Sequence, residues 1–255
     1  MKFSARRDEA PKGSIYLLPS MLTTASLFSG FYAIVSAMNG MYFNAAVAII
    51  IAAIFDGLDG RVARMTGTTS RFGMEYDSLC DLVSFGVAPA VLAYLWVLKP
   101  YGRYGWLAAF LYVATTALRL ARFNTQDCSS SQNTFTGLPC PAAAGMIATS
   151  VLFFEFIDFE IAIQDKALLA LVYVLSYLMV STHHYQSFKH PETTRAKTFH
   201  ALVVMVLLIM VLATEPQVTL FFLGLIYVLS GPVHDGFKLF VKEGNESTEE
   251  EHKTL

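Results

Sequence analysis

Four aspartates with regular spacing are the residues of this sequence best suited to chemistry. Asp56 and Asp59 are three residues apart, and Asp77 and Asp81 are four residues apart. Each pair therefore lies on one face of a helix. Only the short connection TGTTS, residues 66–70, separates the two helical segments. This spacing predicts two antiparallel neighbouring helices with all four carboxylates converging between them.

Such a cluster of carboxylates predicts a metal site. Four unpaired carboxylates at the end of apolar helices would repel one another and lose hydration, so a cation must hold them. A ligand set made only of oxygen atoms indicates Mg²⁺ or Mn²⁺. Four carboxylates are enough for two ions with shared ligands, an arrangement that suits phosphoryl transfer. Helix capping is an alternative for Asp77, but Asp56 and Asp59 lie near a helix end where acidic residues are unfavourable.

The residues between the carboxylates suit a phosphate group. Gly57, Gly60 and Ala63 follow one another at helical spacing and leave room for a ligand to approach the backbone. Close helix–helix packing also uses small residues in membranes, and the two interpretations are compatible. The planar guanidinium of Arg64 matches the geometry of a phosphate or diphosphate.

The composition places these residues in an all-α polytopic membrane protein. Hydrophobic residues make up 55% of the 255 residues and charged residues 15%, less charge than soluble domains carry. The net charge of −2 gives no indication of a nucleic-acid partner. Apolar runs long enough to cross a bilayer recur along the chain. We predict eight spans, at residues 20–38, 42–65, 73–98, 104–123, 138–157, 166–186, 198–213 and 217–235.

The basic residues predict the orientation of the chain. With an even number of spans, all of the 18 Lys and Arg residues except Lys99, Arg103 and Lys166 fall on the side of the two termini. Basic loops stay in the cytoplasm, so we expect both termini and the four aspartates on the cytoplasmic side. We expect residues 1–14 to form a cytoplasmic tail and the acidic segment 238–255 to be disordered.

The aspartate region resembles a known family. The pattern D-x2-D-G-x2-A-R-x8-G-x3-D-x3-D runs without a gap from Asp56 to Asp81 and is similar to the signature of the CDP-alcohol phosphotransferases. The resemblance implies a six-helix core, here residues 15–190, followed by additional transmembrane helices at 191–237. It also implies a CDP-linked donor bound with two divalent ions at the cytoplasmic boundary, and a homodimer.

Three further segments resemble the phosphatidylserine synthase branch of this family, namely DSLCDLVSFGVAPA, LRLARFN (118–124) and FTGLPCPAAAG (135–145). The first span, LPSMLTTASLFSG, is similar as well, although Ser20 and Ser26 stand where that branch usually has Asn. This likeness implies transfer of the phosphatidyl group from CDP-diacylglycerol to the hydroxyl of L-serine, with release of CMP. It also implies a bacterial cytoplasmic (inner) membrane and contact with membrane lipid.

The resemblance assigns roles to individual residues. Asp56, Asp59, Asp77 and Asp81 would bind the metal ions, and Asp81 would also be the base that activates the acceptor hydroxyl. The residues that would bind CDP or its diphosphate are Gly60, Ala63, Arg64, Gly73, Ser70 and Thr23.

Binding of serine requires a partner for its carboxylate. Arg119 and Arg122 lie three residues apart at the predicted cytoplasmic end of the fourth span, and we expect one of them to bind that carboxylate. Anchoring of the helix at the membrane surface is the alternative role for these arginines. Pro139 and Pro141 fit the first turn of the next helix, whose free N–H groups could form a second anion-binding element or a plain helix start.

Two alternatives differ in what they predict. Another acceptor, such as glycerol 3-phosphate or an inositol compound, would keep the family but needs more cationic residues near the site. A cation transporter would place carboxylates near the bilayer midplane on broken helices. Here the carboxylates gather at one predicted boundary beside a Gly/Arg phosphate motif, which favours the enzyme.

Overall fold

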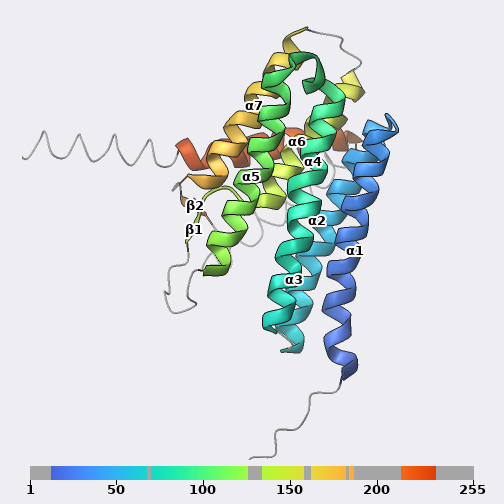
Figure 1. Ribbon diagram of the computed structural model, residues 1–255, viewed down its shortest axis with the longest axis vertical. Helices are drawn as coiled ribbons and strands as arrows, with labels where there is room; N and C mark the ends of the chain where they lie inside the picture. Colours follow the sequence, from blue (N-terminus) through green and yellow to red (C-terminus); the bar gives the residue numbers. More distant parts are fainter. Residues whose placement is uncertain are drawn as a thin grey trace, which may run out of the picture.

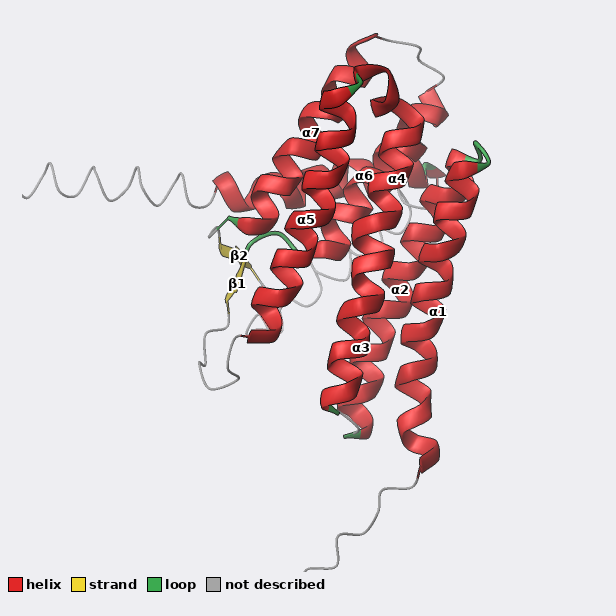
Figure 2. Ribbon diagram, viewed as in Figure 1, coloured by secondary structure: helices red, strands yellow, loops and turns green. Residues whose placement is uncertain are grey.

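The protein is a bundle of helices with one small two-stranded ribbon (Figures 1 and 2). The computed structural model describes residues 13–67, 70–125, 134–157, 162–181, 184–186 and 214–233. The predicted terminal tails 1–14 and 238–255 and the predicted span 198–213 lie almost entirely or entirely outside these ranges. Within them, the helices confirm that the chain is dominated by α structure.

The first two helices, α1 (Gly13–Met38) and α2 (Tyr42–Thr66), form a closely packed antiparallel pair. Hydroxyl groups of α1 bond to backbone carbonyls of α2: Ser26 Oγ donates to Ala52 O at 3.0 Å, and Ser29 Oγ donates to Ala48 O at 2.8 Å. Alanine has a small side chain, which lets two helices approach closely. These bonds fix how far α1 is displaced along α2.

The third predicted span is one continuous helical rod that contains two π-helical turns. It consists of α3 (Arg71–Asp81), the π-helical turn η1 (Leu82–Val87), α4 (Ala88–Ala93) and a second π-helical turn η2 (Tyr94–Leu98). A short 3₁₀ turn, η3 (Lys99–Tyr101), ends it. The first widened turn ends just before Pro89, which has no N–H to continue the α-helical bonding. Wide turns of this kind often lie beside functional sites, and η1 begins directly after Asp81.

The remaining helices complete the bundle. They are α5 (Arg103–Thr125), α6 (Cys140–Ile157), α7 (Ala162–Val180) and the helix Pro216–Val233. The last of these runs across the back of the bundle in Figure 1 and packs on α6, where the rings of Phe153 and Phe221 stack at 4.3 Å.

A short antiparallel ribbon joins the segment before α6 to the segment after α7, and the sequence predicted no strand in either. Strand β1 (Thr134–Thr136) pairs with β2 (His184–Gln186), with Phe135 opposite Tyr185. The prediction of a sixth span reaching residue 186 was therefore wrong at its end, because α7 stops at Val180 and the chain turns into β2. The all-α fold class is confirmed, and this ribbon adds two strands of three residues each.

Four of the described helical segments are long and apolar enough to cross a bilayer: Leu18–Met38, Arg71–Tyr101, Cys140–Ile157 and Pro216–Val233. Lys166–Val180 is a shorter apolar helix. These findings support an integral membrane protein. In Figure 1 the beginning of α1, the end of α2 and the beginning of α3 lie at the same end of the bundle.

Gly30 allows α1 to contact the widened turn η1. A Cβ atom built on Gly30 would lie 2.6 Å from Ser84 Cα and 2.5 Å from Ser84 Oγ. At this point Ser84 Oγ donates to Ser26 O at 3.1 Å. Because the obstructing atoms include backbone, α1 would have to move away if residue 30 carried a side chain.

We therefore expect Gly30→Ala to lower the free energy of unfolding by about 1–3 kcal/mol, the usual cost of overpacking. Gly145→Ala in α6 is the matched control, because nothing lies within 4 Å of the added Cβ atom there, and the helix should gain about 0.5–1 kcal/mol. Thermal unfolding of both variants in detergent micelles measures the difference. Equal midpoints for the two variants would contradict this account of the contact.

Candidate active site

The four aspartates come from two helices whose connection is sharply defined. Helix α2 ends at Thr66 and is capped by Gly67, which has a φ of 64° and donates its N–H to Ala63 O, a common way for a helix to end. Helix α3 begins at Arg71 and is capped by Ser70, whose Oγ accepts the N–H of Gly73 at 3.0 Å. These two caps turn the chain back on itself, so the last turns of α2 face the first turns of α3.

This arrangement brings the carboxylates together. One oxygen each of Asp56, Asp59 and Asp77 lies within 4.8 Å of the other two. The side chain of Asp81 lies against that of Asp56, close enough for a hydrogen bond between the two groups. Two carboxylates at this separation need a shared proton or a cation between them. Of the four aspartates that the sequence predicted to converge, Asp56, Asp59 and Asp77 form one close group, and Asp81 lies beside this group, next to Asp56.

Buried oxygen atoms in this cluster match the requirements of a divalent ion. Asp59 is only 5% exposed, and Oδ1 of Asp77 is buried without a hydrogen-bond partner among the described residues. A buried carboxylate oxygen without a partner is costly, and a metal ion would satisfy it. Because the donors are all carboxylate oxygens, the residues fit Mg²⁺ or Mn²⁺.

Thr23, which the sequence predicted to bind CDP, contacts one of the aspartates in the structure. Its hydroxyl donates to Asp59 Oδ2 at 2.7 Å, and both residues are nearly inaccessible to solvent. The same hydroxyl lies 3.1 Å from Pro19 O. Thr23 therefore orients a carboxylate of the cluster from α1. The sequence pattern contained Thr23 but gave no indication that its partner is Asp59.

The other residues predicted to bind CDP surround the turn between α2 and α3. Gly60 is exposed, and a Cβ atom there would meet nothing within 4 Å. The exposed Arg64 donates from Nε to Gly60 O at 2.9 Å, and Ala63 accepts the helix-capping N–H of Gly67. Ser70 and Gly73 form the cap of α3. The space beside Gly60 is therefore open to a ligand, and Arg64 is exposed next to it. The Ser70 hydroxyl, in contrast, caps α3.

The two arginines predicted for the acceptor differ in their surroundings. Arg119 is partly buried, and its Nη1 donates to Cys140 Sγ at 3.3 Å, whereas Arg122 is exposed. Cys140 lies close enough to Asp81 for the charge of that carboxylate to act on its thiol. In the same way, the charge of Arg119 acts on Tyr227, on the helix Pro216–Val233. Arg119 therefore belongs to the surroundings of the carboxylate cluster, and Arg122 faces away from the core.

A polar link between α3 and α5 was missed by the sequence analysis. Asn124 Nδ2 donates to Ser78 Oγ at 3.0 Å and to Glu75 Oε2 at 3.3 Å. Ser78 lies between Asp77 and Asp81 along α3, so this link holds the aspartate helix against the helix that carries Arg119. The segment LRLARFN contained Asn124, but its partners depend on tertiary structure.

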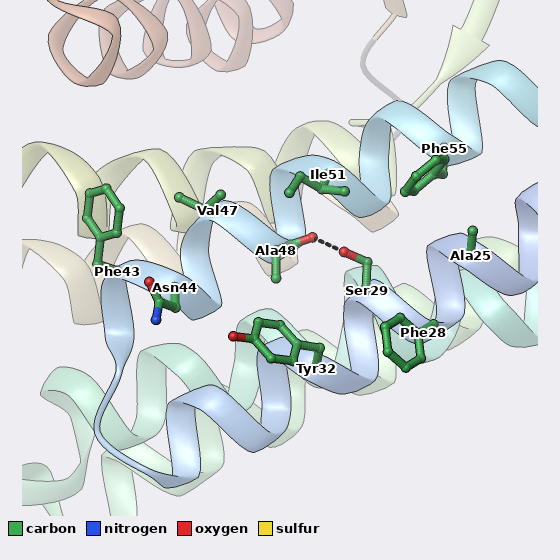
Figure 3. Close-up of a pocket in the computed structure, with 10 residues that line it drawn as sticks. All are labelled: Ala25, Phe28, Ser29, Tyr32, Phe43, Asn44, Val47, Ala48, Ile51 and Phe55. Carbon is green, nitrogen blue, oxygen red and sulfur yellow. Dashed lines mark hydrogen bonds between the residues drawn. The ribbon is translucent and has the colours of Figure 1, made fainter.

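A separate groove lies on the seam of α1 and α2 (Figure 3). It has a volume of about 520 Å³ and is lined by Ala25, Phe28, Ser29, Tyr32, Phe43, Asn44, Val47, Ala48, Ile51 and Phe55. The hydroxyl of Ser29 is already bonded to Ala48 O. The lining suits hydrocarbon and offers no carboxylate, so the groove is distinct from the metal site.

The contact between Thr23 and Asp59 generates a prediction. We expect Thr23→Val to weaken binding of Mn²⁺ about 10-fold, because groups that orient metal ligands typically contribute 10–100-fold to affinity. Thr23→Ser keeps the hydroxyl and should bind Mn²⁺ as the unmodified protein does. Titration calorimetry with Mn²⁺ measures both. Equal affinities for the Val and Ser variants would show that the hydroxyl does not orient Asp59.

Comparison with known proteins agrees with this geometry. Residues 16–178 match the CDP-alcohol phosphatidyltransferase family. The chain is 38% identical over 221 residues to a CDP-diacylglycerol–serine O-phosphatidyltransferase of Helicobacter pylori (strain ATCC 700392 / 26695), covering 87% of this chain and 92% of the relative. It is 36% identical over 172 residues to the enzyme of that name from Bacillus subtilis (strain 168), covering 68% and 91%.

An archaetidylserine synthase of Methanothermobacter thermautotrophicus is 34% identical over 174 residues, which cover 68% of this chain and 70% of that protein. The matched region contains all four aspartates, Thr23 and Arg119. The chain belongs to the CDP-alcohol phosphatidyltransferase family.

Proposed function

We propose that the protein transfers the phosphatidyl group of CDP-diacylglycerol to the hydroxyl of L-serine and releases CMP. The observation that carries this proposal is the cluster of Asp56, Asp59 and Asp77, whose oxygens lie within 4.8 Å of one another in a chain of this family. The relatives that are similar over most of the chain are named for transfer to serine.

The donor is held by its diphosphate at the carboxylate cluster. Asp56, Asp59 and Asp77, together with Asp81 beside Asp56, would hold the Mg²⁺ or Mn²⁺, and we propose two ions. Bound there, the metal supplies positive charge that offsets the charge of the diphosphate and of the leaving CMP. Arg64 and the open backbone at Gly60 contact the diphosphate from the end of α2. The acyl chains lie among the apolar side chains that face the bilayer.

The chemical step breaks a phosphoanhydride bond of the donor and forms a phosphate ester bond to serine. The hydroxyl oxygen of serine attacks the phosphorus that carries diacylglycerol, and the bond from that phosphorus to the bridging oxygen of CMP breaks. Asp81 takes the proton of the hydroxyl. The position of Asp81 beside Asp56, at the edge of the cluster, supports this role as base. Positioning matters because a free serine hydroxyl is a weak nucleophile.

The acceptor approaches from the side of α5 and α6. Arg119 would bind the carboxylate of serine, because its guanidinium is partly buried against Cys140 at the start of α6. Arg122 is exposed and would contribute to anchoring at the membrane surface. An arginine that binds one carboxylate suits an amino acid better than a doubly charged phosphate acceptor.

We place this site at the cytoplasmic face of a bacterial inner membrane, with both termini in the cytoplasm and two copies forming a homodimer. The distribution of Lys and Arg supports the orientation. The segment 15–190 would be the catalytic core, with further transmembrane helices in 191–237.

Release of CMP tests the proposal directly. Purified protein with CDP-diacylglycerol and Mn²⁺ or Mg²⁺ should release CMP with L-serine and not with glycerol 3-phosphate, inositol phosphate or water. Chelation of the metal should stop the reaction. Asp77→Asn and Asp81→Asn should each lower kcat at least about 100-fold, as expected for loss of a metal ligand or a general base. Release with another acceptor would overturn the assignment of serine, and an active Asp81→Asn enzyme would overturn its role as base.

The two arginines give a second test. We expect Arg119→Ala to raise the KM for serine at least about 10-fold, because a charge-assisted hydrogen bond is lost. The KM for CDP-diacylglycerol should stay the same. Arg122→Ala is the matched control three residues away, and its KM for serine should change less than about twofold. The reverse ranking would move the acceptor site to Arg122.

A further inference from the structure

The guanidinium of Arg119 has an unusual partner. Its Nη1 donates to the thiol of Cys140 at 3.3 Å, and its Nε is buried without a hydrogen-bond partner among the described residues. The partner that the structure shows is therefore a neutral sulfur atom and not a carboxylate. A buried guanidinium held in this way keeps unused donors and its full positive charge for a ligand.

Cys140 is held rigidly. It is fully buried and is the first residue of α6. Ahead of it, Gly137 has a φ of 83°, and a Cβ atom there would lie 2.6 Å from Met179 O. The N–H of Leu138 donates to Leu178 O at 3.1 Å. The chain before α6 is thus fastened to the end of α7, which fixes the place of the thiol.

A thiol can orient the guanidinium of Arg119 and still leave its positive charge available to a ligand. A thiol is a weak hydrogen-bond acceptor, so its contact with Nη1 directs the guanidinium without neutralising it. A carboxylate at the same place would form a strong bidentate pair with Arg119 and occupy the donors that a substrate needs. A purely apolar side chain would leave the guanidinium free to adopt other rotamers.

We propose that Cys140 is a positioning residue for the acceptor, whose thiol aims the Arg119 guanidinium at the carboxylate of the incoming amino acid. This inference rests on the proposed function, because it takes Arg119 as the group that binds the acceptor. Cys140 itself touches neither the reacting phosphorus nor the metal ions. Its effect is confined to the binding of the acceptor.

The alternative is that Cys140 only fills space at the start of α6. The substitutions Cys140→Ser and Cys140→Ala separate the two roles, because they produce side chains of similar size that differ in one acceptor atom. Ser150→Ala is the matched control: Ser150 is buried in the same helix, and its hydroxyl bonds to Met146 O at 2.7 Å, away from Arg119.

Steady-state kinetics in the purified protein give the test. Cys140→Ala should raise the KM for serine about fivefold, the effect of losing one modest hydrogen bond. Its kcat and its KM for CDP-diacylglycerol should stay within about twofold of the unmodified protein. Cys140→Ser should restore the KM for serine, and Ser150→Ala should leave it unchanged. Equal values for the Ala and Ser variants, or a parallel rise in the KM of the donor, would overturn the positioning role.

A double-mutant cycle shows whether Cys140 acts through Arg119. In an Arg119→Ala background, Cys140→Ala should cause no further rise in the KM for serine. An additional fivefold rise there would mean that the thiol acts by another route, and the inference would be wrong. Failure of the proposed function looks different, because the unmodified protein would then prefer another acceptor. The Cys140 series would be measured on the KM of that acceptor, and an unchanged value would still overturn the inference.

Discussion

Mutual repulsion of four carboxylates beside apolar helices is the constraint on which the site depends. Asp59 is almost fully buried, and Asp77 has a buried oxygen without a partner among the described residues. Such groups are stable only when a cation or well-placed donors compensate their charge. The surrounding helices therefore have to supply a fixed geometry rather than neutralising partners. A basic side chain inserted among these aspartates would satisfy the charge and remove the ability to hold a metal ion with a diphosphate.

The fixed geometry comes from a row of hydroxyl groups on α1. Thr23, Ser26 and Ser29 follow one another at intervals of three residues, and their hydroxyls bond to Asp59 Oδ2, Ala52 O and Ala48 O on α2. At Gly30, α1 also lies against Ser84, which belongs to the π-helical turn η1 that follows Asp81. Helix α1 thus holds α2 on one side and the α3 rod on the other. It controls the spacing of the two aspartate pairs through hydrogen bonds that its own residues make with both helices.

The spacing of the aspartates was enough to predict that they meet, because helical periodicity and a short turn leave few alternatives. The sequence could not show that the rod 71–98 winds into π-helical turns, since those depend on how Pro89 and the packing of Ser84 are accommodated. It also could not show that Thr23 bonds to Asp59 or that Arg119 lies against Cys140, because each contact joins residues far apart in the chain. The end of α7 was misjudged since β2 is stabilised by its pairing with β1, not by a local pattern.

The site is assembled from two parts that the fold must keep in register. The carboxylates belong to α2 and α3, whereas Arg119 and Cys140 belong to α5 and α6. Asn124 connects the parts by bonding to both Ser78 and Glu75 on α3, and η1 begins at Leu82, directly after Asp81. A transfer reaction needs its nucleophile and its phosphorus within near contact distance. In the proposed function different helices hold the donor and the acceptor, so helix packing would set that distance. Small shifts of α5 against α3 would then affect the rate even with every reactive group intact.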